Sequence, residues 1–257
     1  MTIIDKSTYY VGNDTGILLI HGLGGTPVEM RYIANGLHRA GYTVYCCQLA
    51  GHCGSTEDLQ SVTWKDWLGS VEQALDKLRH CKKVFVGGLS AGSLLALYLA
   101  EKNPNRISGC MLYSPTLVLN GWSLPFYMKW LKHLRPWMML FDMMLSERHP
   151  HGIKDERVRS MIVNSMQANT TDAGTFYTPL STMVQFNCLS AYMQKRLKNI
   201  KVPLITFHPR EDDFAHISNS EQIVREVAGR AEMVVLDDCY HIIVLDRQRD
   251  IVLYKSL

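Results

Sequence analysis

Short hydrophobic runs rich in β-branched residues alternate with segments of helical pattern along most of the chain. The runs that predict strands are residues 17–21, 42–47, 84–88, 108–114, 203–208 and 232–237. The segments with helical periodicity are residues 28–41, 62–80, 93–102, 219–228 and 246–255. Strands that alternate with helices are typical of crossover connections. We therefore expect an α/β fold with a mainly parallel sheet flanked by helices.

The alternation is interrupted between Pro115 and Val202. That stretch contains several helical patterns and no run that convincingly predicts a strand. We therefore expect a single α/β domain over residues 1–257, with a helical cap inserted at about residues 118–200. A chain of 257 residues is long enough for one large domain of this kind.

Composition limits the partners and the location of the protein. The formal net charge is only +3 and the basic residues are scattered, which argues against a nucleic-acid partner. No run of 18 apolar residues occurs, so we expect no membrane span. The seven cysteines are odd in number and show no C-x-x-C spacing, which predicts reduced thiols and a cytoplasmic location.

A serine flanked by glycines stands where a predicted strand meets a predicted helix, in the segment Gly88-Leu89-Ser90-Ala91-Gly92. A serine hydroxyl is a poor nucleophile unless a base takes its proton and a turn exposes its oxygen. In the G-x-S-x-G pattern the serine occupies a strained turn, and the glycines relieve crowding there. We therefore expect Ser90 to be a nucleophile. The Ala91 N–H, at the start of the helix, would then stabilise an oxyanion.

Three further loops, each after a predicted strand, supply the other groups of such a site. The loop HGLGG at residues 21–25 supplies the Leu23 N–H as a second oxyanion donor; it lacks the spacing and the lysine of phosphate-binding loops. In hydrolases of this kind an acid and then a histidine follow the serine. His241 follows the last predicted strand, and Asp212 and Asp213 follow the strand before it. Only one of these adjacent carboxylates can meet the imidazole, and their order along the chain leaves both open.

Six motifs taken together resemble the α/β-hydrolase superfamily, and within it bacterial carboxylesterases and monoacylglycerol lipases. They are HGLGGTP, QLAGHCGST, TWKDWLGSV, GGLSAGS, PREDD and YHIIVLDRQRD. The resemblance covers nearly the whole chain outside residues 120–200. It implies a catalytic acid in an arginine-x-aspartate context, which corresponds to Arg210 and Asp212 and favours Asp212 over Asp213. It also implies the same two oxyanion amides.

Residues 122–145 are unusually rich in Trp, Met, Phe and Leu, at a spacing that predicts an amphipathic helix. The simplest interpretation is that this face packs the cap onto the sheet. A second is that Trp130, Met138 and Phe141 line an apolar acyl pocket, because methionine and aromatic side chains adapt to flexible chains. A third is transient contact with a membrane surface through the cap, since basic residues lie opposite the aromatic ones.

The sequence thus predicts a serine hydrolase that cleaves small-molecule esters of medium to long acyl chains through an acyl-enzyme. Ser90 attacks, His241 moves the proton and Asp212 orients His241. No cofactor and no metal are expected. A thioesterase or an acyltransferase would use the same triad, and a non-catalytic ligand-binding protein would share the fold. The sequence does not predict the oligomeric state.

Overall fold

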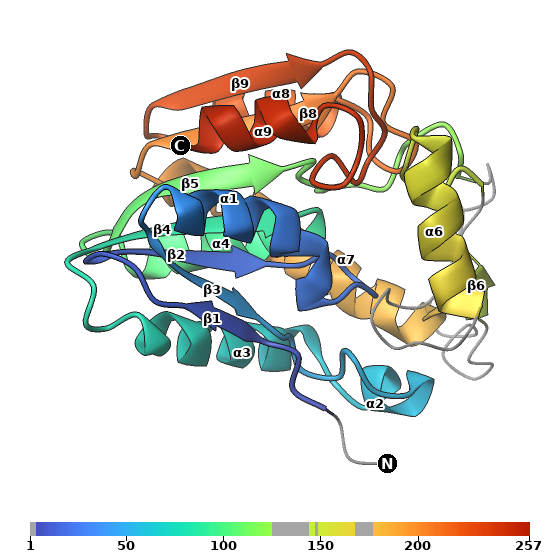
Figure 1. The fold of residues 1–257 in the computed structure, drawn as a ribbon, viewed down its shortest axis with the longest axis horizontal. Coiled ribbons are helices and arrows are strands. Elements are labelled where there is room, and N and C mark those ends of the chain that lie inside the picture. The colour runs from blue at the N-terminus through green and yellow to red at the C-terminus, as the bar shows by residue number, and fades with distance from the viewer. Residues whose placement is uncertain (1–3, 125–143, 147–148, 168–176) are drawn as a thin grey trace.

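The computed structural model describes residues 4–124, 144–146, 149–167 and 177–257. Its main sheet has the strand order β1-β3-β2-β4-β5-β8-β9 (Figure 1). The strands are β1 Thr8–Tyr10, β2 Thr15–Ile20, β3 Thr43–Cys47, β4 Lys83–Leu89, β5 Ile107–Tyr113, β8 Leu204–Pro209 and β9 Ala231–Leu236. Only β1 pairs antiparallel, along β3, and the other neighbours are parallel. The predicted mainly parallel sheet is confirmed, and β1 is an additional edge strand.

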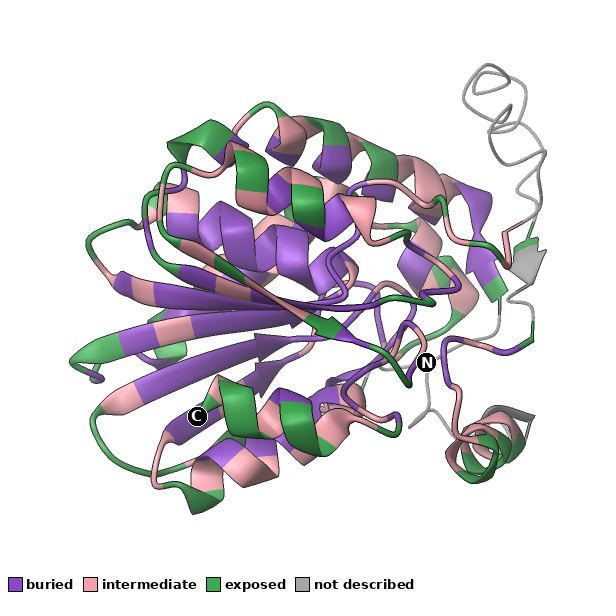
Figure 2. Cartoon of the chain, turned by 90° about the horizontal axis from the view of Figure 1, so that it is seen from above, coloured by how far each residue is buried: buried purple, intermediate pink, exposed green. Residues whose placement is uncertain are grey.

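Helices cover both faces of this sheet. One face carries η1 Pro27–Met30, α1 Arg31–Arg39 and α9 Arg249–Ser256. The other carries α3 Trp64–Lys77, α4 Ala91–Lys102, α7 Leu180–Gln194 and α8 Ser218–Glu226. Two shorter helices, α2 Thr56–Gln60 and η4 Leu197–Asn199, lie in the connections. Figure 2 shows the sheet between the two helical layers, with buried residues along its strands.

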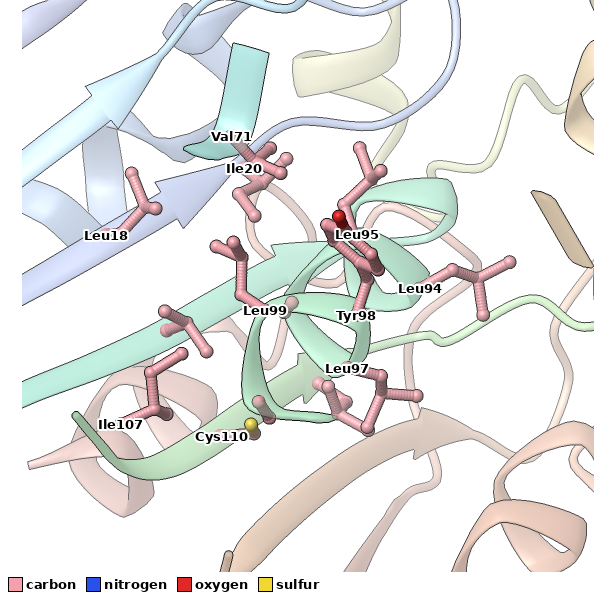
Figure 3. Packing of buried hydrophobic residues seen from close by; sticks show 14 of the residues in the cluster. Leu18, Ile20, Val71, Leu94, Leu95, Leu97, Tyr98, Leu99, Ile107 and Cys110 are labelled. Carbon is pink, nitrogen blue, oxygen red and sulfur yellow. The ribbon is translucent and has the colours of Figure 1, made fainter. Parts of the chain in front are cut away.

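The helix that follows Ser90 is buried on nearly all sides. Every residue of α4 from Ala91 to Ala100 is buried, because the helix lies on β4 and β5 and between α3 and α7. Figure 3 shows Leu94, Leu97 and Leu99 leaving the helix in different directions into the core. A helix that is apolar all round is expected only in such a place. The serine therefore stands at the end of one of the most enclosed elements of the protein.

The segment between β5 and β8 contains more than the helices predicted there. The strands β6 Met144–Ser146 and β7 Tyr177–Pro179 form a separate antiparallel pair. The expectation of a stretch without strands is therefore wrong, because three residues carry too little periodicity to predict a strand. Figure 1 shows α6, Glu156–Gln167, beyond the carboxyl ends of the main strands.

The last helix of this segment belongs to the layer over the sheet. Phe186 and Leu189 of α7 are buried in the same core as α3 and α4. We therefore propose that the cap comprises the part of residues 118–200 that precedes α7. The candidate acyl-pocket residues Trp130, Met138 and Phe141 lie outside the described residues.

Candidate active site

Ser90 occupies a strained turn between β4 and α4. Its backbone angles are φ 54° and ψ −115°, which a residue with a side chain rarely adopts. A Cβ atom at Gly88 would lie 2.1 Å from the Gly92 carbonyl oxygen, and one at Gly92 would lie 2.5 Å from the carbonyl oxygen of Ile20. The Ser90 N–H donates to the Tyr113 carbonyl at 2.8 Å. Gly88 therefore allows the start of α4 to close over the end of β4, and Gly92 allows the turn to fit against the end of β2.

His241 and Asp212 meet in the loops after β9 and β8. The His241 Nδ1 lies 2.8 Å from Oδ2 and 3.0 Å from Oδ1 of Asp212. Both side chains are almost fully buried. Because an ionised carboxylate only accepts hydrogen bonds, Nδ1 carries the proton and Nε2 is left as the basic nitrogen. The carboxylate also accepts from the backbone N–H groups of Phe214 at 2.9 Å and Ala215 at 2.7 Å.

Asp213 points to backbone groups instead of the imidazole. Its carboxylate accepts from the Gly152 N–H at 2.9 Å and from the His241 N–H at 3.3 Å. Burial raises the pKa of Asp213 to about 6, although the nearby His241 acts in the opposite direction. Of the two carboxylates left open by the sequence, the one that meets the His241 ring is thus Asp212. Asp213 ties the His241 loop to Gly152, which lies within the proposed cap.

The loop with the candidate amide of Leu23 rests on two buried histidines. The Gly24 N–H donates to Nε2 of His52 at 3.2 Å, and Nδ1 of His52 lies 3.0 Å from the Ala50 carbonyl. Nε2 of His21 accepts from the Leu49 N–H at 3.2 Å, and its Nδ1 lies 2.8 Å from the Gly22 carbonyl. Each ring therefore carries its proton on Nδ1.

Both rings are held in the neutral form. Burial lowers the pKa of His21 to about 3, with a further contribution from His52, and lowers that of His52 to about 4. A second proton on either ring would face a backbone N–H, so the neutral form is the one that fits. The two histidines therefore support the loop as hydrogen-bond acceptors over the ordinary pH range.

The two predicted oxyanion donors come from the helix that follows Ser90 and from the loop after the neighbouring strand β2. Ala91 is the first residue of α4, so its N–H is one of the four that no carbonyl of that helix can accept. Leu23 lies in the loop after β2, and a Cβ at the adjacent Gly22 would be 3.7 Å from Cβ of Ser90. Strands β2 and β4 are neighbours in parallel register, which brings their carboxyl ends together. The fold thus places the five predicted residues at the carboxyl ends of the parallel strands.

Similarity to known proteins shows the family to which this chain belongs. Residues 13–248 match the model of a hydrolase family described as serine aminopeptidase, S33. The chain belongs to this family. It is 29% identical over 259 residues to a thermostable monoacylglycerol lipase from Bacillus sp. (strain H-257), with 97% of this chain and 91% of that protein covered.

Two further proteins are similar to this chain over nearly its full length. A carboxylesterase from Bacillus subtilis (strain 168) is 22% identical, with 97% of this chain and 94% of that protein covered. A solved structure reported for the metagenome-derived lipolytic enzymes LipS and LipT has a TM-score of 0.81 and 26% identity, covering 97% of this chain and 94% of that one. The expected α/β-hydrolase fold and superfamily are confirmed. The roles of the individual site residues stay predictions.

Thr116 and Glu29 lie beside Ser90. The sequence patterns did not indicate either of these polar residues. The Ser90 hydroxyl is 3.2 Å from Oγ1 of Thr116, which is buried and donates to the Ser114 carbonyl at 3.2 Å. The Glu29 carboxylate accepts from the Gly22 N–H at 3.1 Å. Burial raises the pKa of Glu29 to about 7 against the opposing effects of that hydrogen bond and of His241. Neither residue belongs to a recognisable motif, so only their positions in space reveal them.

An open cavity lies next to the loops that carry the acid and the histidine. Its volume is about 310 Å³, and its lining includes Trp122, Lys154 and Tyr240. The Trp122 indole N–H donates to the Glu211 carbonyl at 3.1 Å, and its ring centroid lies 5.6 Å from that of Tyr240. Tyr240 and Glu211 directly precede His241 and Asp212 in the chain. The exposed Trp122 side chain therefore contacts the two loops that carry the acid and the histidine.

Within the described ranges of the S33 chain, no group of three or more His, Cys, Asp or Glu side chains is arranged to hold a metal ion. In those same ranges, no helix is both long enough and apolar enough to cross a membrane.

Proposed function

We propose that this protein hydrolyses carboxylic esters through an acyl-enzyme formed on Ser90. The observation that carries the proposal is the buried His241–Asp212 pair, at 2.8 Å, on the same edge of the sheet as the strained Ser90 turn. The family match and the names of the relatives, monoacylglycerol lipase and carboxylesterase, support an ester as the substrate. All three side chains come from loops that follow parallel strands, where functional residues of α/β folds gather.

The geometry suggests a role for each group. Ser90 Oγ attacks the ester carbonyl while Nε2 of His241 takes its proton, and Asp212 holds Nδ1–H and stabilises the imidazolium. The N–H groups of Leu23 and Ala91 donate hydrogen bonds to the carbonyl oxygen as negative charge develops on it. The imidazolium then protonates the departing alcohol. Water, activated by the same imidazole, hydrolyses the acyl-serine and restores the free enzyme.

Removal of the nucleophile tests the assignment. In Ser90→Ala we expect esterase activity to fall by a factor on the order of 10³ or more, as in other triads that lose their nucleophile. The variant should also lose labelling by a fluorophosphonate probe, which phosphonylates an activated serine. Thermal unfolding of the variant checks that it is folded. Turnover above about a tenth of the wild-type rate, in a folded variant, would assign the nucleophile elsewhere.

We further propose that the acyl chain is of medium to long length. Each methylene buried in an apolar pocket contributes about 0.8 kcal/mol, so kcat/KM should rise from acetyl toward medium chains until the pocket is full. The measurement is a series of p-nitrophenyl esters from acetyl to palmitoyl, alongside mono- and triacylglycerols, below micelle formation. A rate that falls steadily from acetyl onward would remove Trp130, Met138 and Phe141 as candidate pocket residues.

The location and the surface contacts of the protein are also proposals. No disulfide joins any two of the seven cysteines, all of which lie in the described part of the chain, and this supports a reducing compartment such as the cytoplasm. Transient docking of the cap on a membrane surface remains a proposal of the sequence alone, since residues 125–143 lie outside the described part of the chain.

A further inference from the structure

A second buried histidine stands behind the catalytic acid. His208 lies in β8, four residues before Asp212, and is fully buried. Its Nε2 is 2.8 Å from the Ala215 carbonyl oxygen and 3.4 Å from Oδ2 of Asp212. Its Nδ1 is 2.8 Å from the Ser220 hydroxyl. The mechanism above gives this residue no task, although it is a costly group to bury.

The hydrogen-bond partners define the form of the His208 ring. A carbonyl and a carboxylate both accept, so Nε2 carries the proton and Nδ1 accepts from the Ser220 hydroxyl. The Ser220 oxygen lies in turn 2.9 Å from Oγ1 of Thr206. Burial lowers the pKa of His208, which keeps the ring neutral. The ring is thus anchored on one side to α8 through Ser220.

The other side of the ring holds the turn that carries the acid. The Nε2–H of His208 donates to the Ala215 carbonyl, and the Ala215 N–H donates to Oδ1 of Asp212 at 2.7 Å. The second carboxylate oxygen, Oδ2, meets Nδ1 of His241 at 2.8 Å. A continuous chain of contacts therefore runs from α8 through His208 and Ala215 to the imidazole that we propose as the base.

We propose that His208 is a positioning residue for Asp212, fixing the turn that aims this carboxylate at His241. The inference rests on the proposed function of the triad. A loop carboxylate needs such support, because a catalytic group that is misplaced by about 1 Å can lower the rate on the order of 100-fold. The titratable groups that act on His208 are Asp212, His241 and His216. A neutral ring places an N–H beside the carboxylate without adding a charge that would compete with the His241 imidazolium.

A pair of amide substitutions tests the inference. In His208→Gln the side-chain N–H reaches the position of Nε2, whereas in His208→Asn the amide reaches only as far as Nδ1. We expect the Asn variant to lose about 10- to 100-fold in kcat, with KM unchanged within about twofold, because substrate binding does not involve this turn. The Gln variant should stay within about threefold of the wild-type kcat. His38→Gln, at a half-buried histidine of α1 that bonds the Tyr42 carbonyl, is the matched control and should leave kcat unchanged.

A spectroscopic measurement separates positioning from general packing. The downfield proton resonance of His241 Nδ1–H reports its bond to Asp212, and we expect it in the wild type and His208→Gln but not in His208→Asn. A folded Asn variant with wild-type kcat and an unchanged resonance would overturn the inference. Equal losses in the Asn and Gln variants, with the resonance intact in both, would also overturn it, because they would indicate a packing role.

A further variant covers a failure of His208→Asn to fold. Ser220→Ala keeps the imidazole but removes its anchor, so we expect a kcat reduced by several-fold and an unchanged KM; a wild-type kcat would contradict the inference. The resonance also separates this test from that of the proposed function. If the wild-type protein hydrolyses no ester, the proposed function fails, while the resonance still shows whether His208 positions Asp212.

Discussion

Two adjacent carboxylates at the same loop have different environments and therefore different expected roles. Asp212 accepts from two backbone N–H groups and from the His241 ring, whereas Asp213 accepts only backbone N–H groups among the hydrogen bonds described above. An acid that holds the Nδ1–H of His241 can orient the ring and stabilise the imidazolium that forms. The proposed orienting role thus belongs to Asp212.

The two positions can be separated by matched amide substitutions. Asp212→Asn should lower kcat by a factor on the order of 10³ to 10⁴, because an amide at this position no longer selects the Nδ1–H tautomer of His241. Asp213→Asn should change kcat by less than about tenfold, since its contacts hold backbone and not the ring. Steady-state kinetics of both variants at one pH decide between them. The reverse ranking would transfer the role to Asp213.

At the scale of elements, the site depends on how closely the β4–α4 turn approaches the neighbouring strand. The backbone of Gly92 lies against the carbonyl groups that end β2, so there is no room for a side chain. Gly69, in the middle of α3, is different, because a Cβ there would meet nothing within 4 Å. The same chemical change is therefore expected to have opposite effects at the two positions.

Gly92→Ala and Gly69→Ala form the corresponding test. The first should destabilise the protein by about 1–3 kcal/mol or more and lower kcat, because the turn must move away from β2. The second should stabilise it by about 0.5–1 kcal/mol with kcat unchanged, because alanine is the better residue inside a helix. Urea unfolding and esterase assays give both values. A Gly92→Ala variant as stable and active as the wild type would show that the turn tolerates displacement.

For the whole molecule, the buried titratable groups near the site make stability change with pH in opposite directions. His21 and His52 have pKa values lowered to about 3 and about 4. Below about pH 6.5 these two rings bind protons in the unfolded chain but stay neutral in the folded protein. Protonation therefore stabilises the unfolded state, and the contribution of the two histidines to stability falls as the pH falls. Glu29 has a raised pKa, so its contribution is present below about pH 4.5 and is lost as the pH rises through about 7.

Glu29→Gln isolates the second effect. The substitution removes the ionisation, so the free energy of unfolding of the variant relative to the wild type should increase between about pH 4.5 and pH 7, by at most about 3 kcal/mol. Glu232→Gln, at an exposed position on the edge strand β9, is the matched control for the loss of one glutamate charge. Denaturant unfolding across this range measures both. A constant difference for Glu29→Gln would mean that the carboxyl titrates normally in the folded protein.

Local patterns in the sequence determined much of the architecture. The six longer parallel strands follow from β-branched runs, and the helices between them from apolar periodicity and end signals. The Ser90 turn was predictable because the chemistry of a tight strand-to-helix turn requires glycine at fixed positions. The short strands β1, β6 and β7 were not, since three residues stabilise a strand only through a partner that is distant in the chain.

Only the tertiary structure decided which side chains meet. Their order along the chain leaves Asp212 and Asp213 equivalent, and only the family resemblance favours Asp212. The direction of each carboxylate is set by the partners that the folded loops place around it, His241 for one and Gly152 for the other. The positions of Glu29 and His208 beside the site depend in the same way on contacts across the turns that follow β2 and β8. Periodicity records which face of an element is buried. It does not record the neighbour found there, because that neighbour is supplied by the packing of the whole chain.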